Sequence, residues 1–157
     1  NQFAYEGNEI RKHVYERYRS MWNAAKEEGL LLIVNSSYRD YETQDAVWKD
    51  YAEANGEEWA DNKAARAGSS EHETGLALDI VTNNVIMNEF ENTEEFKWLQ
   101  DNAYKYGFIL RYPKGKENIT GYEYESWHYR YVGEEVAKEI HDLDITFDEY
   151  YAYYLDK

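Results

Sequence analysis

The sequence predicts an α+β fold in which helices flank a small antiparallel β-sheet. Helical and strand-like segments are mixed along the chain, without the strict alternation that is typical of a parallel sheet. The connection across residues 107–132 is short enough for its two strand-like segments to pair antiparallel. A chain of 157 residues without repeats or linkers has the usual size of one domain. We therefore expect a single domain over residues 1–157.

Helices are predicted where apolar residues recur every three or four positions. In chain order they cover residues 8–28, 41–55, 57–66, 92–106, 133–141 and 146–155. Gly29 and Gly107 are expected to end the first and the fourth, and Asn92 or Thr93 to cap the start of the fourth. The inner face of the second is expected to carry Ala46, Val47, Trp48 and Tyr51.

Strands are predicted at four short apolar runs, each of which lies between turn residues or polar segments. These runs are residues 30–34, 76–81, 108–112 and 127–132. A polar loop is expected over residues 113–123, between the last two strands.

Composition excludes several classes of function. The formal net charge of −15 and the lack of a basic run disfavour nucleic acid as a partner, because a polyanion would be repelled. The chain has no cysteine, which excludes disulfides, thiolate metal sites and cysteine nucleophiles. Its 17 tyrosines suit a wet cleft with aromatic walls for a peptide or saccharide, although packing alone explains most single tyrosines.

The chain shows no membrane-spanning signal. No apolar run approaches the roughly 20 residues that a spanning helix needs, and no signal peptide is visible. Absence of cysteine fits an exported bacterial protein. We expect an extracytoplasmic location, in the cell envelope or secreted, for a monomer whose leader or anchor lies outside this chain; a cytoplasmic location is the alternative.

Two histidines stand in segments that suit a metal site. His72 precedes Asp79 by seven residues, and Gly75 between them permits the sharp turn that would let both reach one ion. His128 would come from the neighbouring strand. Two imidazoles and one carboxylate leave a zinc ion with an open position for water, as hydrolysis requires. The alternative is a pair of partly buried histidines in ordinary hydrogen bonds.

Glu125 is the candidate general base beside this site. It lies three residues before His128, so on a regular strand the two side chains would point to opposite faces. A turn or bulge before Trp127 must therefore aim both inward. Glu125 would then take the proton of a hydrolytic water without binding the metal.

Five segments, in the same order, resemble the VanY-type D-alanyl-D-alanine carboxypeptidase family, which includes LdcB-like L,D-carboxypeptidases. This family is part of the wider group with lysostaphin-type and Hedgehog-type zinc domains. Two segments carry the candidate ligands: Ser70-x-His72-x-x-Gly75-x-Ala77-x-Asp79 and Glu125-x-x-His128. The other three are residues 37–44, 107–113 and 127–133.

The resemblance implies a role for each site residue. His72, Asp79 and His128 would be the Zn²⁺ ligands and Glu125 the catalytic base. Arg39 would stabilise the oxyanion on the scissile carbonyl. The residues implied in binding the substrate are Ser70 and Gln44, for the terminal D-Ala, together with Tyr38 and Trp127.

The chain departs from the family pattern around Arg39. Ser37 stands where glycine is frequent, and Asp40 stands where serine is common. An acid beside Arg39 could compete for its charge, and a surface ion pair of Arg39 with Asp40 or Glu42 is the alternative to a catalytic role.

Arg111 and Arg130 are conspicuous in so acidic a chain. Either guanidinium could bind a substrate carboxylate through two hydrogen bonds, or neutralise nearby acids such as Asp79 or Glu125. The structural role is the prediction for Arg130, and both roles stay open for Arg111.

The resemblance implies a zinc-dependent carboxypeptidase that removes the C-terminal D-Ala from peptidoglycan stem peptides. Its reaction would be L,D-cleavage of the tetrapeptide or D,D-cleavage of the pentapeptide. The short chain has no evident insertion for a selective lid, which favours the L,D type. A non-catalytic zinc module that binds cell wall or protein, and a muropeptide endopeptidase, are the alternatives.

Overall fold

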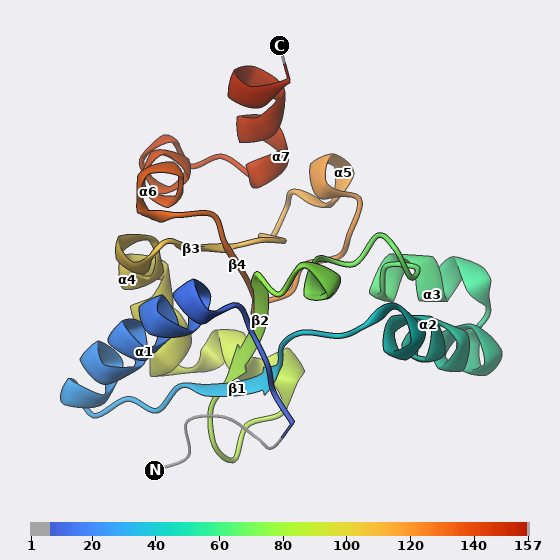
Figure 1. Cartoon of the computed structure of the whole chain (residues 1–157), viewed down its shortest axis with the longest axis horizontal. Helices are drawn as coiled ribbons and strands as arrows, with labels where there is room; N and C mark the ends of the chain where they lie inside the picture. The colour runs from blue at the N-terminus through green and yellow to red at the C-terminus, as the bar shows by residue number, and fades with distance from the viewer. Residues whose placement is uncertain (1–6, 157) are drawn as a thin grey trace.

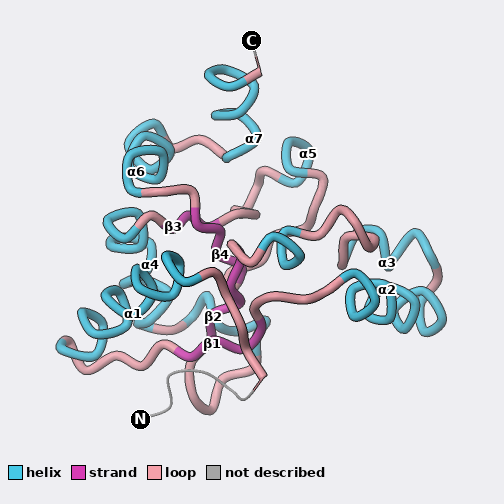
Figure 2. The backbone as a smooth tube through the Cα atoms, in the orientation of Figure 1, coloured by secondary structure: helices cyan, strands magenta, loops and turns pink. Residues whose placement is uncertain are grey.

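A computed structural model describes residues 7–156, and within them the chain forms a four-stranded antiparallel sheet. The strand order is β1-β2-β4-β3, with bounds Ile33–Ser36, Ala77–Val81, His128–Tyr131 and Phe108–Leu110 in that order. The sheet occupies the middle of the molecule (Figure 2). The predicted fold class and the antiparallel pairing of the last two strands are confirmed.

Helices surround this sheet. The longer ones are α1 (Lys12–Glu27), α2 (Tyr41–Asn55), α3 (Glu57–Lys63), α4 (Glu94–Asn102) and α6 (Glu134–Leu143). The short ones are α5 (Glu117–Thr120), α7 (Phe147–Tyr150) and the 3-10 helices η1 (Glu71–Thr74), η2 (Met87–Asn92) and η3 (Ala103–Tyr106). Figure 1 shows α1 and α4 on one side of the strands and the α2–α3 pair on the other.

Alternation along the strands separates the core from the face that carries the polar motifs. Leu78 and Ile80 of β2 and Tyr129 of β4 are fully buried in the main apolar cluster with α1 and α4. Asp79 and His128 lie between or beside these residues in sequence and therefore point to the opposite face. A second apolar cluster, around Ile109, Ala137 and Tyr150, anchors α6 and α7.

Several element boundaries differ from the predictions. The first strand begins at Ile33 instead of residue 30, because Leu30 is still bonded to Ala25 at the end of α1. The expected polar loop contains α5, which is too short to show a helical period. The expected final helix is a single α-turn followed by a π-helical turn, Tyr151–Leu155. On α2, Trp48 is buried as expected, but Ala46 is exposed.

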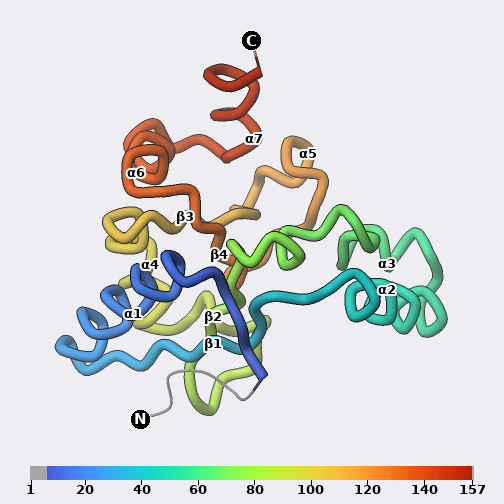
Figure 3. The backbone as a smooth tube through the Cα atoms, viewed as in Figure 1, coloured from blue at the N-terminus to red at the C-terminus, as the bar shows by residue number. Residues whose placement is uncertain are grey.

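The N-terminal segment 7–11 runs alongside the loops that carry the motifs (Figure 3). The backbone N–H of Arg11 donates to the carbonyl of Gly75, and the N–H of Tyr38 donates to the carbonyl of Glu9. This segment therefore ties residues 37–44 to the segment with His72 and Asp79. Among the described helices, none combines the length and the apolarity that crossing a bilayer would need.

Candidate metal centre and active site

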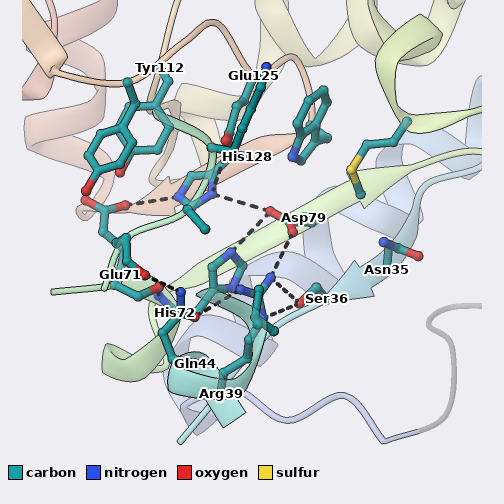
Figure 4. A pocket seen from close by; sticks show the side chains of 18 of the residues that line it. Asn35, Ser36, Arg39, Gln44, Glu71, His72, Asp79, Tyr112, Glu125 and His128 are labelled. Atoms are coloured by element: carbon teal, nitrogen blue, oxygen red, sulfur yellow. Dashed lines mark hydrogen bonds and ion pairs between the residues drawn. The ribbon is translucent and has the colours of Figure 1, made fainter. Parts of the chain in front are cut away.

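Strand register brings two of the candidate ligands together. Asp79 on β2 is paired with His128 on β4, and the carboxylate Oδ1 lies 3.4 Å from the imidazole Nδ1. On its other side Asp79 is paired with Ser36 of β1, next to an irregularity in that ladder. Three strands thus place their polar side chains in one row across the sheet (Figure 4).

His72 reaches the same point from η1. Ser70 begins this short helix in a capping box with Glu73, and Gly75 ends it in the left-handed region with a φ of 71°. A Cβ at Gly75 would lie 3.1 Å from the side chain of Arg11, so the position favours glycine for two reasons. The turn aims His72 Nε2 at Asp79 Oδ1, at 3.4 Å.

The three donor atoms fit a zinc ion. One ligand atom from each of His72, Asp79 and His128 lies within 4.8 Å of the other two. Two ligands at zinc distances and a tetrahedral angle are themselves about 3.4 Å apart. Asp79 Oδ1 is buried and makes no hydrogen bond within residues 7–156, although two imidazole nitrogens face it. A cation would satisfy this oxygen and both nitrogens at once.

In each imidazole, the ring nitrogen that does not face Asp79 has a partner that orients the ring. His72 Nδ1 lies 2.6 Å from the carbonyl oxygen of Ser37, so it must donate and leave Nε2 free for a metal. His128 Nε2 lies 3.2 Å from the carboxylate of Glu71, which leaves Nδ1 free. Hydrogen bonds of this kind set the tautomer and the direction of metal-binding histidines.

The electrostatics of the site favour a cation. Burial lowers the pKa of His128, but the adjacent carboxylates of Asp79 and Glu71 outweigh it and raise that pKa to about 10. Burial raises the pKa of Glu71, yet the hydrogen bond with His128 and the charges of Arg111 and Arg130 bring it down to about 2. The neighbouring carboxylates thus favour positive charge at this point, and a metal ion would supply that charge.

Glu125 lies beside the ligands without joining them. Residues 126 and 127 form a turn before β4 begins, and this turn aims Glu125 and His128 toward the same cavity, as the spacing required. Glu125 Oε2 lies 3.5 Å from His128 Nδ1. Burial raises the pKa of Glu125 to about 7, against the charge of His128 and with help from Asp79. This value suits a group that takes up and releases protons near neutral pH.

Arg39 approaches Asp79 from the opposite side. Its guanidinium donates to Ser36 Oγ at 3.0 Å and to Gln44 Oε1 at 3.0 Å, and lies 3.6 Å from Asp79 Oδ2. Asp40 does not compete for this charge, because its carboxylate accepts the N–H of Thr43 and caps α2. Figure 4 shows Glu125 and Arg39 on opposite sides of the three ligands.

A cavity of about 380 Å³ opens over the site. The predicted residues Ser70, Gln44 and Trp127 line it. Gln44 is only 1% exposed, and both ends of its amide are engaged, by Arg39 and by the carbonyl of Ala65. Its geometry is therefore that of a residue that holds Arg39 in place.

Tyr38 departs from its predicted place. Its side chain is 44% exposed, and it is not among the described residues that line the cavity. The neighbouring Ser37 and Arg39 point inward, and successive side chains of an extended segment point to opposite sides. The predicted role of Tyr38 in the substrate pocket is therefore not supported by the geometry.

The sequence reasoning missed several residues of the site. Glu71, Tyr112, Tyr122 and Lys63 also line the cavity, and the ring of Tyr112 lies 4.9 Å from that of His128. Arg111 and Arg130 pair with Glu71, not with Asp79 or Glu125. Glu71 adjoins His72 in sequence, which is a signal that could have revealed it. The others required knowledge of how the strands and helices pack together.

A family model for VanY, D-alanyl-D-alanine carboxypeptidase, matches residues 7–134. The chain belongs to the VanY family. This match confirms the family that the motif segments indicated. Curated relatives bear carboxypeptidase names and one solved neighbour is a complex with Zn(II), which supports the expected enzyme class and zinc cofactor.

Among curated VanY relatives, the putative carboxypeptidase YodJ of Bacillus subtilis (strain 168) is 50% identical over 145 residues, which are 90% of this chain and 53% of YodJ. The chain spans about half the length of the first curated relatives that it matches.

Two solved structures resemble nearly the whole of this chain. The LdcB LD-carboxypeptidase has a TM-score of 0.89 and 46% identity, and the match covers 96% of this chain and 74% of that one. A mutant of the vancomycin resistance D,D-pentapeptidase VanY, from a VanB-type resistance cassette and in complex with Zn(II), has a TM-score of 0.82 and 34% identity, with coverage of 96% and 87%.

Proposed function

We propose that this chain is a zinc-dependent carboxypeptidase that removes the C-terminal D-Ala from peptidoglycan stem peptides outside the cytoplasm. The observation that carries the proposal is the arrangement of five side chains over one cavity. Three donor atoms converge on a point beside Asp79 Oδ1, a carboxylate flanks that point on one side, and a guanidinium flanks it on the other. A non-catalytic zinc module would need neither Glu125 nor Arg39 there.

Each of these groups has a step in peptide hydrolysis. Zinc held by His72, Asp79 and His128 would supply Lewis acidity, which polarises the scissile carbonyl and eases loss of a proton from water. Glu125 takes that proton and passes it to the departing amine of D-Ala. Arg39, fixed by Ser36 and Gln44, donates to the oxygen on which negative charge develops.

The substrate contacts the polar wall of the cavity near Ser70. Its Oγ accepts the N–H of His72 at 3.3 Å, so its own O–H remains to donate into the cavity. Trp127, which also lines the cavity, supplies an aromatic surface for the stem peptide. We assign Ser70 and Trp127 to substrate binding on this ground, and Gln44 to the support of Arg39.

We favour the tetrapeptide as substrate, which makes the reaction L,D-cleavage. Support comes from the higher identity and TM-score of the match to the LdcB LD-carboxypeptidase, compared with those of the D,D-pentapeptidase. The D,D reaction on the pentapeptide is the second candidate, because the family model bears the name D-alanyl-D-alanine carboxypeptidase.

The test is incubation of the zinc-loaded protein with purified tetrapeptide and pentapeptide muropeptides, followed by mass spectrometry. We expect loss of one D-Ala from the tetrapeptide. Release from the pentapeptide alone would replace the L,D assignment by the D,D one. Cleavage inside the stem would indicate an endopeptidase, and intact peptides with a zinc-loaded protein would favour a binding module.

A further inference from the structure

A series of charged contacts joins the C-terminal helix α7 to a candidate metal ligand. Asp148 Oδ2 of α7 lies 2.5 Å from Arg111 Nη1, and Arg111 Nε lies 2.6 Å from Glu71 Oε1. The other oxygen of Glu71 lies 3.2 Å from His128 Nε2. Three contacts thus connect Asp148 to His128, although the two residues belong to separate elements.

This series of contacts is largely shielded from water. The side chains of Arg111 and Glu71 are 11% and 13% exposed, and that of Asp148 is 31% exposed. Phe147, the neighbour of Asp148, covers the guanidiniums of Arg111 and Arg130 at 5.4 and 5.6 Å. Ion pairs at this depth are much less screened than surface pairs, so their geometry matters.

Helix α7 is held firmly enough to fix this geometry. Thr146 and Glu149 form a capping box at its start, and Tyr150 is buried in the apolar cluster with Ile140 of α6. Asp148 therefore reaches Arg111 from an anchored position.

Asp148 and Glu71 contact different edges of the Arg111 guanidinium. Arg111 presents its Nη atoms to Asp148, at 2.5 and 3.3 Å, and only its Nε edge to Glu71. Without Asp148, the guanidinium is free to turn and bind both oxygens of Glu71 in the favoured bidentate manner. That contact would draw Glu71 Oε2 away from His128 Nε2, and the ring of His128 would lose its orienting partner.

We propose that Asp148 is a positioning residue for the metal site, acting on His128 through Arg111 and Glu71. Helix α7 lies beyond residue 134, where the match to the family model ends. The inference rests on the zinc binding proposed above, and it adds the C-terminal helix to the parts of the chain that determine zinc affinity.

The test is zinc affinity, measured by competition with a chromophoric chelator. Loss of a residue that orients a zinc-binding histidine weakens metal binding by about 10–100-fold, and Asp148 lies two contacts farther out. We expect Asp148→Asn to weaken binding about three- to tenfold. Asp148→Glu keeps the charge and should restore most of the affinity. Asp142→Asn, which removes a surface pair with Lys138 on α6, is the matched control and should leave the affinity unchanged.

A double-mutant cycle with Glu71→Gln distinguishes positioning from a purely structural role. If Asp148 acts through Glu71, its substitution should have little further effect on zinc affinity in the Glu71→Gln background. Additive losses would overturn the proposal, as would an Asp148→Asn protein that binds zinc like the wild type. A wild-type protein that binds no zinc would instead overturn the proposed function, and with it this inference.

Discussion

Asp79 and His128 occupy the same rung of the ladder between β2 and β4, with Oδ1 3.4 Å from Nδ1. Side chains that face each other across antiparallel strands share one side of the sheet, so backbone pairing brings these two candidate ligands together. A slip of the register by one residue would move either one into the apolar core. The candidate metal site therefore depends on this register as well as on η1, which supplies His72.

Asp79→Asn should remove most of the zinc affinity. An amide keeps the size of the carboxylate but lacks its charge, and a poor ligand at this position leaves only two imidazoles. We expect affinity to fall at least about a hundredfold, beyond the usual effect of an outer partner. Metal analysis after dialysis measures the loss of zinc. The control is Asp45→Asn, which removes a surface ion pair with Lys49. Full zinc occupancy in Asp79→Asn would contradict the assigned ligand set.

Glu125→Gln should separate zinc binding from catalysis. The side chain adjoins His128 but is not one of the three converging donors, so zinc affinity should stay near that of the wild type. Loss of a general base lowers kcat by about 10²–10⁴-fold. D-Ala release and metal content are measured on the same preparation. The control variant is Glu135→Gln, at an exposed position of α6. An active Glu125→Gln protein would remove the mechanism proposed here.

Arg39→Lys tests the role of a fixed guanidinium. Lysine keeps the positive charge but cannot contact Ser36 and Gln44 with the same planar fork. We expect kcat to fall about 10²-fold, within the range found when one oxyanion donor is removed, while zinc affinity stays unchanged. Wild-type kcat in Arg39→Lys would assign Arg39 to structure alone.

Activity should fall as the solution becomes acidic. Glu125 must be a carboxylate to accept a proton, and its pKa of about 7 in the metal-free site is raised, so the active form is lost as pH falls through that range. Bound zinc lowers this pKa, which places the midpoint at or below about 7. Protonation of the two imidazoles adds to the loss by weakening zinc binding. A value of kcat/KM that stays constant from neutral pH to pH 4 would contradict this prediction.

Glu71 should stabilise the metal-free fold at neutral pH and lose that effect in acid. Its pKa falls from the ordinary 4.5 to about 2 in the folded state. A lowered pKa means that stabilisation is complete above about 4.5 and disappears as pH falls toward 2. The shift corresponds to a free energy on the order of 3 kcal/mol.

Urea unfolding of wild type and Glu71→Gln in chelator, at pH 7 and pH 3, measures this contribution. The difference in unfolding free energy should be larger at pH 7. A difference that does not depend on pH would show that the contribution of Glu71 is not electrostatic.

The candidate ligands and the base were predictable because their chemistry lies in short, local patterns. The spacing of His72, Gly75 and Asp79, and that of Glu125 and His128, indicated both the residues and the turn that each segment needed. Helix α2 was predicted with its observed bounds, and the structure shows Asp40 capping its start and Gly56 following its last residue.

What the sequence by itself determined is the set of candidate side chains: those proposed to bind zinc, accept a proton or stabilise an oxyanion. Only the tertiary structure decided that Arg111 and Arg130 neutralise Glu71, that Gln44 holds Arg39, and that Tyr38 faces away. The physical reason is that the type of a side chain, and its spacing from nearby motif residues, can be read within one segment of the sequence. Its partner, by contrast, depends on which strands pair and in which register, and that follows from burial of the whole core.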